Sequence, residues 1–189
     1  MKLEHSFEIA APLDSVWEAL IDLERVAPCL PGASITGHDE DGTYHGTFTV
    51  KLGPTTANYA GTVTLGEIDK AQHLATLHAR GTDKRGQGGA TATVENRMAA
   101  VEGGTRVDTH TDMTITGRLA RFGRGGMIED ISHRLLRDFA TCLQTQLAAD
   151  RPADGAPAAP QPAREVRGIS LFFSVLWERI KRLFGGAKA

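Results

Sequence analysis

The histidines and cysteines are the side chains with the greatest capacity for chemistry in this sequence. Seven histidines are scattered along the chain, and none has the His-Glu-x-x-His or other short spacing typical of a metal site. His73 and His78 would lie on opposite faces of a strand. Cys29 has no base beside it, and we expect a small buried apolar side chain rather than a nucleophile. The sequence thus predicts neither a metal site nor a group of nucleophile, base and orienting residue.

A glycine-rich segment at residues 121–126 is the other place where unusual chemistry could arise. Its glycines predict a mobile loop that holds the apolar side chains Leu119, Phe122 and Met127. We consider two interpretations, a gate for an apolar ligand and a flexible connection anchored by Phe122. A phosphate-binding loop is disfavoured because no Walker spacing or lysine follows the glycines.

Length and composition predict one globular domain with a tail. The chain has 189 residues, 41% of them hydrophobic, and a formal net charge of -2. This apolar content excludes a disordered chain. Cys29 and Cys142 lie far apart in the sequence, and the chain is large enough to fold without a covalent cross-link, so we expect no disulfide framework.

Localisation and nucleic-acid binding follow from the charged and apolar residues. The first five residues contain no apolar signal segment, and no apolar run reaches the length of a membrane span. We therefore expect a cytoplasmic protein. The body is acidic and the last 26 residues are basic, which argues against nucleic acid as a partner and suggests that the tail has its own anionic partner.

The pattern of apolar residues predicts an α+β domain. We expect a first strand at residues 7–10, a helix at 13–23 after Pro12, and a short helix at 24–30. About six antiparallel strands follow, separated by turn signals. The body closes with a long amphipathic helix at residues 127–147. The helix has a single apolar face, so the sheet must curl around it.

Four short motifs in this body resemble one protein family. The motifs are Ala11-Pro12 through Trp17 with Leu30-Pro31-Gly32-Ala33; Lys51-Leu52-Gly53-Pro54 with Tyr59-Ala60-Gly61; Arg80-Gly81-Thr82-Asp83 with Gly86-Gln87-Gly88; and Gly117-Arg118-Leu119-Ala120-Arg121-Phe122-Gly123. In this order they resemble the CoxG family of carbon monoxide dehydrogenase subunits, which belongs to the START-like, or SRPBCC, superfamily. The resemblance covers residues 1 to about 148.

The resemblance implies a fold and a partner. The fold would be the helix-grip of Bet v 1-like proteins, a curved antiparallel sheet wrapped around a long C-terminal helix. Family members accompany molybdenum hydroxylases such as aerobic carbon monoxide dehydrogenase, which implies a role in linking that enzyme to the membrane. The family brings no metal-binding or nucleophile signature.

A helix laid across a curled sheet leaves a cavity wherever side chains are too small to fill the space. Gly46 and Gly61 stand among large apolar residues, and only 6% of the chain is aromatic. These glycines could instead mark bends or bulges in the sheet. Given the implied fold, we predict a ligand cavity lined by Trp17, Phe48, Val50, Leu52, Tyr59, Gly61, Val63, Met98, Met113, Ile115, Leu119, Phe122, Met127, Ile131 and Leu135.

The C-terminal part divides into a linker and a helix. We assign residues 1–149 to the ligand-binding domain, 150–168 to a flexible Pro/Ala-rich linker, 169–184 to an amphipathic helix and 185–189 to a disordered end. The helix is too short and too charged to span a bilayer, but its composition suits the membrane interface. The alternative is a helix that docks on its own body or in a groove on a partner protein. The predicted membrane-binding residues are Phe172, Phe173, Leu176, Trp177, Arg179, Ile180, Lys181, Arg182, Leu183 and Phe184.

The two parts together predict a carrier without enzymatic activity or a covalent cofactor. An apolar cavity tethered to the inner face of the cell membrane would take a lipophilic molecule from the bilayer. Since the resemblance implies a quinone-reducing partner, we expect the cargo to be a respiratory quinone, menaquinone or ubiquinone. The alternatives are an adaptor that recruits the dehydrogenase without binding a ligand, and a maturation chaperone for it.

Overall fold

The described part of the chain comprises residues 1–52, 55–117, 120 and 126–150 of a computed structural model. Apart from Asp150, the predicted linker, tail helix and disordered end lie outside it. The elements are β1 (Lys2–Ile9), α1 (Leu13–Ile21), α2 (Leu23–Val26), η1 (Ala27–Cys29), β2 (Ala33–His38), β3 (Thr43–Leu52), β4 (Thr55–Asp69), β5 (Leu74–Asp83), β6 (Gly89–Val101), β7 (Gly104–Ile115) and α3 (Met127–Ala149).

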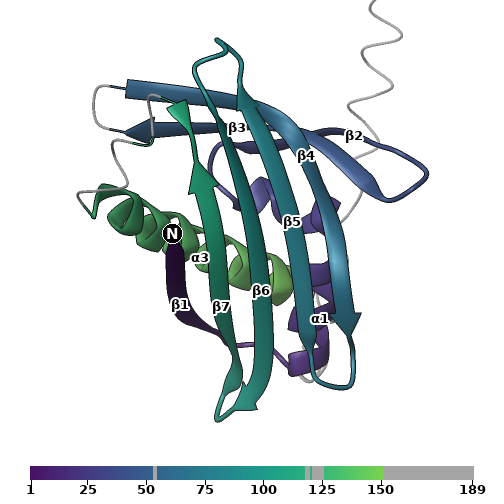
Figure 1. Cartoon of the computed structure of the whole chain (residues 1–189). Coiled ribbons are helices and arrows are strands. Elements are labelled where there is room, and N and C mark those ends of the chain that lie inside the picture. Colours follow the sequence, from purple (N-terminus) through teal and green to yellow (C-terminus); the bar gives the residue numbers. More distant parts are fainter. Residues whose placement is uncertain (53–54, 118–119, 121–125, 151–189) are drawn as a thin grey trace, which may run out of the picture. The chain divides into compact units, whose positions relative to one another are not determined.

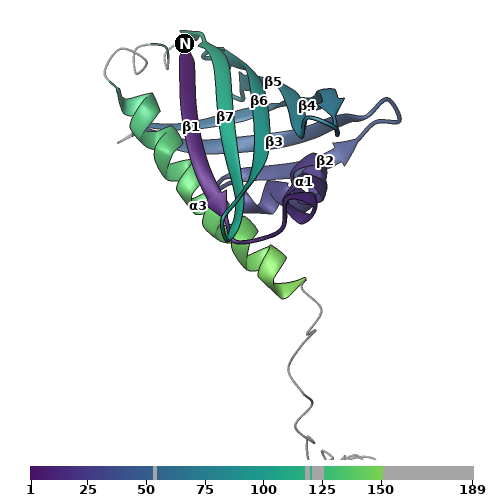
Figure 2. The ribbon, with the colours of Figure 1, turned by 90° about the horizontal axis from the view of Figure 1, so that it is seen from below.

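All seven strands form one antiparallel sheet in the order β1-β7-β6-β5-β4-β3-β2. The predicted α+β architecture and the six-stranded meander after the first helices are confirmed. The first strand is longer than predicted, because it pairs with β7 from Lys2 to Ile9. Both views show β2 and β3 running across the direction of β1 and β7, so the sheet curls strongly (Figures 1 and 2).

The long helix α3 lies on the concave side of the sheet (Figure 2). Its close approaches to other elements are concentrated on β1 and η1. Helix α1 begins after Pro12, whose fixed φ suits a helix start, and buries Val16, Trp17 and Leu20. The two helices thus cover one end of the curled sheet and the edge strand β1.

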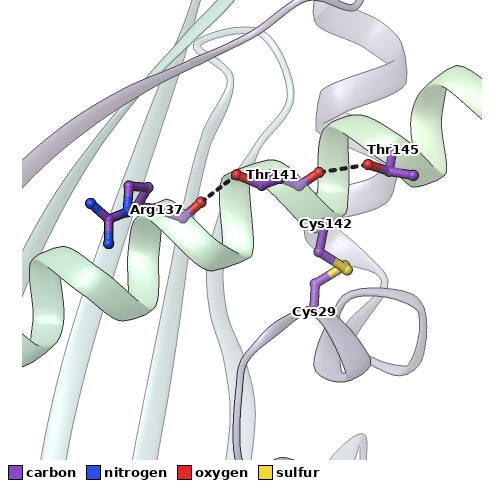
Figure 3. Close-up of a disulfide and its surroundings, with 5 residues drawn as sticks. All are labelled: Cys29, Arg137, Thr141, Cys142 and Thr145. Carbon is purple, nitrogen blue, oxygen red and sulfur yellow. Dashed lines mark hydrogen bonds between the residues drawn. A yellow bond between two sulfur atoms is a disulfide. The ribbon is translucent and has the colours of Figure 1, made fainter.

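A disulfide joins η1 to α3 and corrects the prediction made from the cysteines. Cys29 and Cys142, 113 residues apart in sequence, are bonded with their Cα atoms 5.3 Å apart (Figure 3). Cys29 is buried, as predicted, but it is not a free thiol. The prediction was wrong because distance along the chain says nothing about proximity once α3 packs against η1. Arg25 of α2 and Asp150 form an ion pair at the same end of α3.

We predict that this disulfide stabilises the body by closing a long loop in the unfolded chain. Replacing both cysteines with serine should lower the free energy of unfolding by about 2–4 kcal/mol. Urea denaturation with and without a reductant measures the effect. The reductant should destabilise the wild type and leave the double variant unchanged, whereas two titratable thiols in the untreated native protein would contradict the disulfide.

Candidate functional site

The strand register places one set of side chains on the inner face of the sheet, toward α3. Side chains of directly paired residues share a face, and the paired Phe48 and Tyr59 pack with Ile131 of α3. The same register continues across the sheet to Ala79 and Ala92. The inner face therefore carries mainly apolar side chains from β3 to β7.

Three glycines lie opposite one another on adjacent strands and form what we term the glycine row. Gly46 pairs with Gly61, and Gly61 pairs with Gly81. A Cβ atom on Gly61 would overlap the backbone of Arg80 and Gly81, and one on Gly46 would lie 2.7 Å from the carbonyl oxygen of Ser34. The strands thus approach too closely for a side chain here, which supports the interpretation of these glycines as the bend of the sheet.

Two separate apolar clusters occupy the two ends of the inner space. The first, here the Trp17 cluster, joins α1 and the end of α3 to the sheet and includes Met98, Val107 and Leu143. The second, the Tyr59 cluster, consists of Ala57 and Tyr59 with Phe48, Val50, Ala90, Ile115 and Ile131 packed against them. The ends of the inner space are therefore filled by different sets of side chains.

Between these clusters, apolar side chains of the inner face remain half-buried. They belong to neither cluster and are Val63, Leu65, Leu77, Ala79, Ala92, Val94 and Met113. The close approaches of α3 are concentrated on β1 and η1 rather than on these central strands. We term this region the apolar hollow.

The predicted cavity residues divide among these regions. Phe48, Val50, Tyr59, Ile115 and Ile131 come together in the Tyr59 cluster, and Val63 and Met113 face the apolar hollow. Gly61 lies at the bend of the sheet.

The remaining predicted residues lie elsewhere. Trp17 and Met98 are 2% and 3% exposed in the Trp17 cluster, so the protein itself surrounds them. On α3, Leu135 is half-buried and Met127 is exposed at the first turn. The side chains of Leu52, Leu119 and Phe122 lie outside the described residues.

Strand β5 supplies inner-face residues that the sequence analysis missed. Leu77, Ala79, Gly81 and Asp83 share this face with Tyr59 and Val63 through the β4–β5 register. The signal was present as an alternation of small or apolar residues with Thr76, His78 and Arg80. Register between strands, rather than the pattern within one strand, shows which set faces the helix.

Most polar side chains of the inner face have partners within the protein. The Thr105 hydroxyl donates to the carbonyl oxygen of Ala11, and the Thr109 hydroxyl donates to Asn96 Oδ1. Asp83 Oδ1 accepts a hydrogen bond from the backbone N–H of Arg85 in the turn after β5. These polar groups are therefore satisfied and leave the inner face predominantly apolar.

A groove of about 720 Å³ runs between the edge strand β1 and α3. Much of its lining is polar or charged, including His5, Glu8, Asp130, Arg134 and Arg137. It lies at the sheet edge, and its lining includes none of the half-buried side chains of the apolar hollow. Because the lining also includes Phe7, Leu136 and Ala140, the groove offers both polar and apolar groups.

His5 and Ser132 meet in this groove but are not arranged for nucleophilic catalysis. The Ser132 hydroxyl donates to the carbonyl oxygen of Glu129, so the 3.2 Å contact with His5 Nε2 has the histidine as donor. His5 Nδ1 is buried without a partner, so no carboxylate orients the ring. Burial lowers the pKa of His5, and neighbouring His133 lowers that pKa further. The pair lacks the base that would activate the serine.

Metal binding and membrane crossing find no support among the described residues. None of their His, Cys, Asp and Glu side chains form a group of three suited to a metal ion. No helix in residues 1–52, 55–117, 120 and 126–150 is long and apolar enough to cross a bilayer.

Comparison with known proteins identifies both a family and a fold. The sequence model of the CoxG family, whose members are described as carbon monoxide dehydrogenase subunits, matches residues 6–148. No curated protein matches the chain in sequence. A conserved protein from Geobacillus kaustophilus superposes with a TM-score of 0.67 at 18% identity, over 79% of this chain and 96% of that chain.

Two further solved structures show the same likeness. An aromatase/cyclase from Streptomyces sp. R1128 gives a TM-score of 0.58 at 19% identity, covering 82% of this chain and 99% of that chain. A protein from Mycobacterium smegmatis gives 0.56 at 18% identity, covering 79% and 92%. At these identities the likeness shows the fold alone, the helix-grip of Bet v 1-like proteins.

We predict that the bend at the glycine row depends on the absence of a side chain at Gly61. Gly61→Ala should lower the free energy of unfolding by about 1–3 kcal/mol, because its Cβ would overlap backbone atoms that cannot move freely. Gly37→Ala in β2 is the matched control, since nothing lies within 4 Å of its Cβ position. Equal unfolding midpoints for both variants in urea would contradict this role of Gly61.

Proposed function

Because the chain belongs to the CoxG family of carbon monoxide dehydrogenase subunits, we propose that it carries a lipophilic ligand for a molybdenum-containing carbon monoxide dehydrogenase or a related hydroxylase. The ligand is a respiratory quinone, menaquinone or ubiquinone. The protein holds it in the apolar hollow and presents it to the dehydrogenase, which reduces it. The carrier then returns the product to the membrane.

The observation that carries this proposal is the apolar hollow between the two clusters. A protein of this size normally packs its interior to the density of an organic crystal. Here half-buried apolar side chains line the centre of the inner face while both ends are packed. An apolar ring gains free energy by leaving water for such a surface, at about 25 cal/mol per Å² of apolar area.

Attachment to the membrane belongs to the residues after the body. The amphipathic pattern of residues 169–184, with aromatic and basic side chains, supports a helix lying at an anionic membrane surface. On this proposal the protein works at the cytoplasmic face of the cell membrane. Cytosolic thiols are usually kept reduced. The redox state of Cys29 and Cys142 in cells is therefore a check on the proposed location at the cytoplasmic face.

The proposal gives the chain no catalytic role of its own. The inner-face polar groups Thr105, Thr109 and Asp83 are engaged within the protein, and the His5–Ser132 pair lacks an activating base. Electrons and protons for quinone reduction then come from the partner enzyme. This division supports a binding role for the fold.

We predict that filling the apolar hollow blocks quinone binding. Ala92→Phe places a ring in the hollow and should weaken binding of menadione, a soluble naphthoquinone, by at least about tenfold in calorimetric titration. Ala60→Phe is the matched control, because Ala60 is exposed on the outer face of β4. If both variants are folded, as judged by circular dichroism, and bind menadione with equal affinity, the hollow is ruled out as the binding site.

Removing residues 150–189 separates a carrier from an adaptor. The remaining body should bind menadione with unchanged affinity, because the hollow lies within it. It should no longer sediment with vesicles containing phosphatidylglycerol, whereas the full chain should. A full-length protein that reaches these vesicles but binds no menadione, with or without its tail, would favour the adaptor that binds no ligand.

A further inference from the structure

Tyr59 brings a hydroxyl group into one of the apolar clusters of the inner face. The side chain is only 8% exposed and lies among Phe48, Val50, Ala90, Ile115 and Ile131. No hydrogen bond of its hydroxyl is present in the described part of the chain. The hydroxyl oxygen is not one of the described polar atoms that are buried without a partner, so it still reaches solvent. The hydroxyl is therefore available to bond to a group from outside the protein.

The sheet holds the Tyr59 ring in one place. The ring lies over Gly81, where a Cβ atom would come within 3.3 Å of the Tyr59 Cβ and 3.5 Å of its Cδ1. A larger residue at Gly81 would displace the ring. Phe48 on one side and Asp83 on the other are the directly paired neighbours of Tyr59 on the same face. The hydroxyl is therefore positioned by backbone geometry rather than by a bond of its own.

The surroundings also keep the hydroxyl protonated. Burial raises the pKa of the Tyr59 phenol, and the nearby Asp83 carboxylate raises that pKa further. At neutral pH the group is consequently a hydrogen-bond donor. The Asp83 carboxylate is occupied by the backbone N–H of Arg85 and is not bonded to the phenol.

We propose that Tyr59 is the polar anchor of the ligand site and donates a hydrogen bond to a carbonyl oxygen of the bound molecule. The inference rests on the proposed carrier function and narrows it. The site takes an apolar ring that bears a carbonyl, with the carbonyl at the Tyr59 cluster and the rest of the molecule along the apolar hollow. An apolar molecule without an acceptor binds through the hollow alone.

The test compares two probes and two tyrosines in the full chain. Menadione carries carbonyls, and 2-methylnaphthalene has the same methylated ring system without them. Tyr59→Phe should weaken the binding of menadione about fivefold, the effect of one net hydrogen bond. The affinity for 2-methylnaphthalene should not change. Tyr44→Phe removes the only other tyrosine hydroxyl, which shares the inner face beside Val63 but lies outside the Tyr59 cluster, and it should weaken menadione binding less than Tyr59→Phe does.

A second measurement, by ¹³C NMR, reports on the environment of the Tyr59 hydroxyl without a substitution at Tyr59. With tyrosine labelled by ¹³C at the ζ carbon, the wild type gives two signals, which Tyr44→Phe assigns. Menadione should shift the Tyr59 signal and 2-methylnaphthalene should not shift it comparably. Both results together support the anchor.

The contrary outcomes separate the anchor from the carrier function. If the wild type binds menadione and Tyr59→Phe binds it with the same affinity, the anchor is overturned and the proposed carrier function is not affected. An equal loss of affinity for menadione and 2-methylnaphthalene in Tyr59→Phe would also overturn the anchor, because Tyr59 would then act by packing alone. A wild type that binds neither probe would overturn the anchor and the proposed function together.

Discussion

The packing of α3 against β1 and η1, rather than against the centre of the sheet, is the constraint on which the rest of the structure depends. Its buried residues Leu143 and Leu147 join the Trp17 cluster, and the disulfide to Cys29 fixes the same end. Ile131, near its start, reaches the Tyr59 cluster. A helix held at its ends and along one edge leaves the apolar side chains of the central strands half-buried.

The curl of the sheet completes this arrangement. At the glycine row the backbones of β3, β4 and β5 approach one another too closely for side chains, and the strands beyond it cross the direction of β1. The bend sets the inner face of β4 and β5 around the hollow. It also leaves the space over Gly81 that the Tyr59 ring occupies. The same glycines thus shape the sheet and the site.

Much of this architecture could be predicted from the sequence, because the periodicity of apolar residues reports local structure directly. The helix after Pro12, the meander and the long final helix all follow from it. The disulfide could not be predicted, since it depends on how α3 meets η1. Similarly, the assignment of Trp17 and Met98 to a packed cluster, and of Leu77 and Ala79 to the hollow, depends on strand register, which no single segment encodes.

The central claim is that the body contains an apolar space which a lipophilic molecule occupies. Native mass spectrometry of the full chain, purified gently from a host that makes quinones and followed by solvent extraction, tests it most directly. The account predicts a mass increment equal to a quinone, released on extraction and identified in the organic phase. A wild-type protein that carries no extractable quinone, and that gains none when quinone is supplied in vesicles, would contradict it.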